Sequence, residues 1–90
     1  MIRARKRPLE VEAIEIRPEN IHDIFDFGGP NIYIHHPTRN LKMYVKVNTL
    51  HGVTEAHEGD FLVRGIKGDF YPVQRDTFLE TYDILSQDAE

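Results

Sequence analysis

Residues 58–83 read EGDFLVRGIKGDFYPVQRDTFLETYD, and this segment contains the densest set of structural signals in the chain. Residues 61–64 are too apolar for a half-exposed strand, so we expect them to be buried on both faces. Residues 65–68 form a loop whose two glycines can adopt positive φ, and residues 69–73 return as the partner strand. Pro72 lacks an amide hydrogen, so it predicts an edge position or a strand end. The segment therefore predicts an antiparallel hairpin.

A short helix is predicted after this hairpin, over residues 77–82, with Asp76 as its N-cap. Three of its apolar side chains fall on one side: Phe78, Leu79 and Tyr82. Residues 83–85 predict a final short strand, and residues 86–90 a frayed tail.

Alternating apolar and polar side chains predict further strands upstream, over residues 9–16, 31–36, 42–50 and 53–56. In the first strand the apolar face is expected to comprise Leu9, Val11 and Ala13, before the phase slips at Ile14 and Ile16. In the third strand the apolar face comprises Met43, Val45 and Val47. Residues 51–52 predict the tight turn between the last two strands.

A first helix is predicted over residues 21–27. Asn20 is its expected N-cap, and Asp23 resembles the second residue of a capping box. Its expected apolar face comprises Ile21, Ile24 and Phe25. The sequence Gly-Gly-Pro at residues 28–30 should end the helix.

These elements predict an α+β fold. It comprises a small, mainly antiparallel curled sheet or partial barrel of five to seven short strands with two short helices, because the helices are too few for parallel crossovers. One domain should span residues 8–85, between a basic arm at residues 1–7 and the tail at residues 86–90. The chain has no cysteine, which excludes disulfides, thiolate metal sites and a thiol nucleophile. With no apolar run near the ~20 residues of a membrane helix and no secretory signal, we expect a cytoplasmic protein.

Charge is distributed unevenly along the chain. Four of the eleven basic residues lie in the arm, namely Arg3, Arg5, Lys6 and Arg7. Residues 8–90 therefore have seven basic against fifteen acidic residues, a net charge of −8. Such a body repels phosphate backbones, so nucleic acid is an unexpected ligand except through the arm. We interpret the arm as a solvated end, with contact to nucleic acid or to an acidic partner as the alternative.

Few residues suggest chemistry. Imidazole and carboxylate groups suit several transition metals, but the histidine spacing does not favour a shared ion, so we expect no metal and no cofactor. The residues considered for such a site are His22, His35, His36, His51, His57, Glu55 and Asp60. Asp60 and Asp69 follow glycines in similar triplets and either face each other across the hairpin mouth or bond local backbone groups. The only serine, Ser86, lies in the tail, so we expect no enzyme activity, with a cryptic acid–base enzyme as the alternative.

Residues 58–83 resemble a widespread group of short, uncharacterised phage and prophage proteins, whose C-terminal half typically reads PGDYIIKGVKGEFYPCKPDIFEKTYE. The matching positions include Gly59, Asp60, Gly65, Lys67, Gly68, Phe70, Tyr71, Pro72, Asp76, Phe78, Thr81 and Tyr82. Residues 8–14 and 49–52 also resemble that group's KKPVVVEAVQ and TLEG. The departures are Glu58 for proline, Asp69 for glutamate and residues 73–75 for Cys-Lys-Pro. The resemblance implies a phage or prophage accessory gene and no particular activity.

The expected function is therefore that of a small, non-enzymatic phage or prophage accessory protein. It would bind a protein partner, with self-association through sheet edges. We expect the phenylalanines to form a core and Tyr71 to be the most exposed aromatic residue of the C-terminal half. Sequestration of a nucleotide-like ligand in anti-defence is an alternative, and a minor virion component another. The candidate binding residues are Tyr71, Arg64, Lys67, Arg39 and Lys42, the last four as phosphate contacts.

Overall fold

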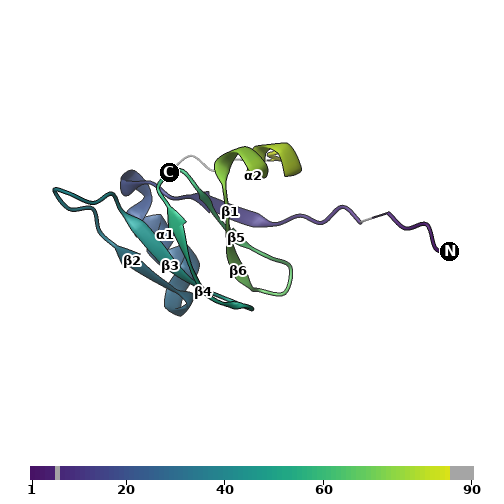
Figure 1. Ribbon diagram of the computed structural model, residues 1–90, viewed down its shortest axis with the longest axis horizontal. Coiled ribbons are helices and arrows are strands. Elements are labelled where there is room, and N and C mark those ends of the chain that lie inside the picture. The colour runs from purple at the N-terminus through teal and green to yellow at the C-terminus, as the bar shows by residue number, and fades with distance from the viewer. Residues whose placement is uncertain (6, 86–90) are drawn as a thin grey trace.

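The computed structural model describes residues 1–5 and 7–85, and it confirms the α+β class (Figure 1). Within these residues, six strands form two antiparallel three-stranded sheets that stay open instead of closing into a barrel. Sheet A has the order β1-β5-β6, formed by Glu12–Glu15, Phe61–Arg64 and Phe70–Val73. Sheet B has the order β2-β3-β4, formed by Ile32–His35, Tyr44–Thr49 and Gly52–His57. The two helices are α1 (Ile21–Gly28) and α2 (Arg75–Thr81).

Strand β5 has both faces packed, one in the core between the two sheets and the other beneath α2. Leu62 and Val63 are both fully buried although they point to opposite faces of sheet A, which confirms the prediction for this strand. Leu62 belongs to the core between the sheets, together with Phe70 of β6. Val63 lies on the other face with Phe61, whose ring stacks on Phe78 of α2 at a centroid distance of 4.2 Å.

The inner face of sheet B supplies the other half of the core. Val45 and Val47 of β3 are fully buried, as is Met43 just before the strand, so the predicted apolar face is confirmed. Ala56 of β4 lies opposite Val45 and completes this face. Helix α1 packs beside β2 and contributes Ile24, which is also fully buried.

The β5–β6 hairpin has the predicted pairing and one unpredicted glycine geometry. Pro72 lies on β6, an edge strand of sheet A, as expected. Gly68 has a φ of +80°, whereas Gly65 does not adopt positive φ. A Cβ atom on Gly65 would lie 2.7 Å from Oδ1 of Asp69, so this glycine is explained by close approach instead.

The first strand is shorter than predicted, and its inward face is different. It pairs with the four residues of β5 and begins at Glu12, so Leu9 has no strand opposite it and is 49% exposed. The inward side chains are Ile14 and Ile16, while Ala13 is exposed. The N–H of Ile16 donates to the carbonyl of Asp60 at 2.8 Å. This bond fixes the backbone so that Ile14 and Ile16, instead of Leu9, Val11 and Ala13, face the core.

One predicted helix cap is confirmed in position only, and the other is wrong. Asn20 occupies the N-cap position of α1, as predicted. The side chain of Asn20 does not cap α1, because its Nδ2 donates to the Glu15 carbonyl at 3.0 Å. Helix α2 begins at Arg75 with Gln74 in the N-cap position, so Asp76 lies in the first turn.

The predicted faces of both helices are partly wrong. In α1 the apolar side chain that is fully buried is Ile24, and in α2 the buried one is Phe78. Phe25 and Leu79 lie at the margins of these buried faces, so they are 62% and 44% exposed. Residues 83–85 form no strand, so the predicted final strand is wrong: the chain leaves α2, which packs on sheet A through Phe78, without pairing with an edge. The predicted tail, residues 86–90, lies outside the described residues. Across residues 1–5 and 7–85, no helix is long and apolar enough to cross a membrane.

Candidate binding face

The outer face of sheet B is exposed, whereas the outer face of sheet A lies under α2. Strand register places alternate side chains of the three strands on this side of the sheet, opposite the core. We call this surface the bare face; its residues are Tyr33, His35, Tyr44, Lys46, Asn48, Val53, Glu55 and His57. Tyr33 and Val53 are 65% and 68% exposed, so large side chains here remain in contact with water.

Three rings form a row across the bare face, one from each strand. His35 stacks on Tyr44 with a centroid distance of 4.5 Å and an interplanar angle of 10°. The Tyr44 ring lies 6.4 Å from that of His57, on the other side. Nδ1 of His35 is buried and has no hydrogen-bond partner within the described residues. The row therefore presents an aromatic surface in which stacking fixes the His35 and Tyr44 rings, while the unsatisfied His35 nitrogen lies beneath it.

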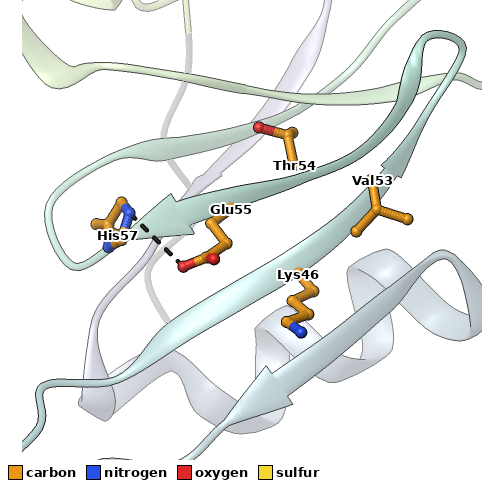
Figure 2. A pocket seen from close by; sticks show the side chains of 5 residues that line it. All are labelled: Lys46, Val53, Thr54, Glu55 and His57. Atoms are coloured by element: carbon orange, nitrogen blue, oxygen red, sulfur yellow. Dashed lines mark ion pairs between the residues drawn. The ribbon is translucent and has the colours of Figure 1, made fainter.

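A second row of charged residues lies beside the rings. Lys46 of β3 is directly opposite Glu55 of β4, and Oε1 of Glu55 lies 3.9 Å from Nε2 of His57. An open depression of about 580 Å³ is lined by Lys46, Val53, Thr54, Glu55 and His57. Figure 2 shows Lys46, Glu55 and His57 on one side of the two strands, with Thr54 directed away from them. The depression thus brings together an ammonium group, a carboxylate and an imidazole on two paired strands.

A second depression, of about 350 Å³, lies between α1 and the edge strand β2. Its lining is more apolar and includes Phe25 and Ile21 from the helix and Ile32 and Ile34 from the strand. Tyr33 also lines it, so this depression adjoins the bare face at its β2 margin.

The four predicted phosphate contacts are not brought together. Arg39 and Lys42 lie in the β2–β3 connection, and Lys67 lies in the β5–β6 loop at the other end of the molecule (Figure 1). Arg64 is already engaged, since its guanidinium pairs with Glu12 and lies 4.8 Å from the Phe27 ring centroid. Neither depression is lined by any of these four cations. One copy of the chain therefore lacks the cluster that the nucleotide alternative requires.

Tyr71, the fifth predicted binding residue, is half-buried instead of exposed. It shares the face of sheet A that α2 covers, and its phenol is hydrogen-bonded with Tyr82. Burial, this hydrogen bond and the nearby negative charge of Asp69 raise the pKa of Tyr71 to about 12. Its phenol therefore serves the packing of α2 and is turned away from the bare face.

Asp60 and Asp69 do not form a pair across the hairpin mouth. Asp60 precedes β5 and accepts a hydrogen bond through Oδ2 from the His57 N–H at 2.8 Å. Asp69 lies beyond the other end of β5, where its carbonyl accepts from the Gly65 N–H at 2.7 Å. At ~3.3 Å per residue, the five residues from position 60 to position 65 span roughly 16 Å. The local backbone role expected for Asp60 is confirmed. Across the described residues, no group of three or more histidine, aspartate or glutamate side chains is placed to hold a metal ion.

The bare face was not predicted from the sequence, although the sequence contains a signal for it. Tyr33, Tyr44 and His57 occupy alternate positions opposite the apolar residues that form the core, so their common face follows once the register is known. Comparison with known proteins finds no matching family model, no matching curated protein and no matching solved structure. A proposal for the function therefore depends on the bare face and on the amino-acid sequence.

Proposed function

We propose that this chain is a small, non-enzymatic accessory protein of a phage or prophage, active in the host cytoplasm. It binds a protein partner through the bare face of sheet B. The phage origin is supported by the resemblance of residues 58–83 to short phage and prophage proteins. The binding role is supported by one observation above the others: of two equal sheets, one has its outer face covered by a helix and the other exposes tyrosine and histidine rings.

A protein partner suits the chemistry of this surface better than a nucleic acid. Tyrosine is enriched in protein interfaces because its ring provides apolar contact area and its hydroxyl a hydrogen bond. Tyr33 and Tyr44 lie on adjacent strands of the bare face, with Lys46 and Glu55 beside them. Paired opposite charges provide orientation at the rim of an interface, whereas the net charge of −8 over residues 8–90 repels phosphate backbones.

The experiment is site-specific photo-crosslinking in lysogenic or infected host cells. A photoreactive amino acid replaces Lys46 on the bare face, and a matched control carries it at Glu80 on α2, which is also exposed. We expect a discrete crosslinked protein from position 46 and none from position 80. Equal crosslinking at both positions, or none at either while the protein is folded and expressed, would contradict the proposal.

A further inference from the structure

Strand β4 is an edge of sheet B with backbone groups directed outward. It is the last strand in the order β2-β3-β4, and five of its six residues are exposed. The His57 N–H donates to the Asp60 carboxylate and not across to β3. Bonded and non-bonded pairs alternate along an antiparallel ladder, so Glu55 and Val53 also point their N–H and C=O groups away from β3. These groups can pair with one more strand.

The edge at β4 also differs from the other three edges in charge. On β1, Glu12 pairs with Arg64, and Glu15 pairs with Arg17 at 2.7 Å and with Arg75. Strands β2 and β6 contain no carboxylate, and β6 contains Pro72. Among the described edge strands, β4 alone has a carboxylate with no arginine on it: Glu55 has His57 as its ion-pair neighbour and Lys46 opposite it on β3. An added strand with arginines would find its complement here.

The basic N-terminal segment has the composition of such a strand. The described residues 1–5 and 7–9 are exposed and extend away from both sheets (Figure 1). In an extended chain Arg3, Arg5 and Arg7 lie on one side, with Ile2 on the other. Ile2 is 90% exposed, so its apolar surface has no cover within the described part of the molecule. The basic segment extends away from the acidic part of its own chain. The acidic surface that it can contact therefore belongs to a second molecule.

We infer that this segment of one copy docks as an additional strand along β4 of a second copy. Its arginines then lie on the bare-face side next to Glu55, and Ile2 lies on the side of Thr54 and Ala56. Two such exchanges, made reciprocally, give a closed dimer in which each sheet B has four strands. Opposite charges on adjacent strands and the satisfied edge amides supply the stabilisation. The inference shares Glu55 with the bare face of the proposed function, but it concerns the edge of the sheet and is tested separately.

The experiment measures self-association of the full chain by sedimentation equilibrium at low and at high salt. We expect a dimer that weakens as salt rises. The variant R3E/R5E/R7E and the variant E55R should each raise the dimer dissociation constant roughly tenfold. Mixing the two should restore association at low salt, because each reversed segment meets the charge that it now complements. The control E80R, an equal charge change on exposed α2, should leave association unchanged.

A backbone variant separates strand addition from general charge attraction. Val53→Pro removes an outward amide and leaves all charges in place, so it should also weaken the dimer; its circular dichroism and melting curve report whether it folds. A monomer at every concentration, a failure of the mixed variants to associate, or an equal effect of E80R would overturn the inference. A monomer that still gives the crosslink from position 46 would overturn it and leave the proposed function standing.

Discussion

The two sheets of this protein have the same number of strands and opposite outer surfaces. In sheet A, Phe61 and Val63 face outward from the core and are covered by α2 through Phe78. In sheet B, the corresponding positions carry Tyr33, Tyr44 and His57, and no helix covers them in the described part of the chain. The protein thus uses one short helix to complete a hydrophobic layer and leaves the other face with rings that tolerate water. The contrast separates a surface that stabilises the fold from one that is available for binding.

The largest expected effect comes from removing the cover of sheet A. Phe78 is 6% exposed and its ring stacks on Phe61, so Phe78→Ala should lower the free energy of unfolding by about 3–5 kcal/mol. Urea unfolding followed by circular dichroism measures this loss, and binding of a hydrophobic dye reports the exposed face of sheet A. A loss below about 1 kcal/mol would mean that the two outer faces are equivalent, and the contrast would fail.

The next effect tests whether the two sheets unfold together. Gly52 in the β3–β4 hairpin and Gly68 in the β5–β6 hairpin have φ values of +114° and +80°, and each has open space where a Cβ would lie. Substitution by alanine should therefore cost only backbone strain, about 1–3 kcal/mol at either site. We expect each variant to melt in one transition, since β5 belongs to both layers. Two separate transitions in either variant would show that the sheets are independent units.

Alkaline pH should destabilise the covered side of sheet A. The raised pKa of Tyr71, about 12 against an ordinary value of 10.0, means that the unfolded chain releases this proton first. The associated stability is complete below pH 10 and is lost as the pH rises towards about 12. Tyr71→Phe should therefore melt at a temperature that falls less steeply over this range than that of the wild type. The exposed control Tyr33→Phe should follow the wild type; identical slopes for all three proteins would contradict the role of Tyr71.

The smallest effect on stability should come from the bare face. Tyr33 is 65% exposed, so Tyr33→Ser should change the free energy of unfolding by less than about 0.5 kcal/mol. The same change should abolish the partner crosslink from position 46, if the bare face is the binding surface. A large loss of stability would show that Tyr33 belongs to the packing, and an unchanged crosslink would place binding elsewhere.

The hairpins and the strand faces of this fold could be predicted from the sequence, because they depend on local patterns. The strand at residues 61–64 and the buried apolar face of the strand predicted over residues 42–50 are confirmed, since alternation and apolar runs follow from the geometry of a strand. The caps and the phase of the first strand could not be predicted, because distant contacts decide them. Asn20 bonds to the Glu15 carbonyl, and Ile16 to the carbonyl of Asp60, far along the chain.

The candidate site was harder to predict than the fold. Residue type alone favours cationic side chains as phosphate contacts, yet Arg39 and Lys67 lie on connections at opposite ends of the molecule (Figure 1). The bare face depends instead on the register of three strands and on the absence of a covering helix from one of two sheets. Strand register and helix cover both depend on contacts between distant parts of the chain. A short sequence motif therefore does not reveal them.

The order of the strands along the chain has a consequence for the order of folding. Sheet B is built from consecutive strands, but β1 must wait for β5, and the bond from the Gly59 N–H to the Ile16 carbonyl joins residues 43 positions apart. Contacts of long sequence separation form slowly, because the intervening loop must close first. The three strands of sheet B can therefore pair, with their rings in register, before β1 joins β5 in sheet A. We expect the bare face to form before the layer that α2 covers.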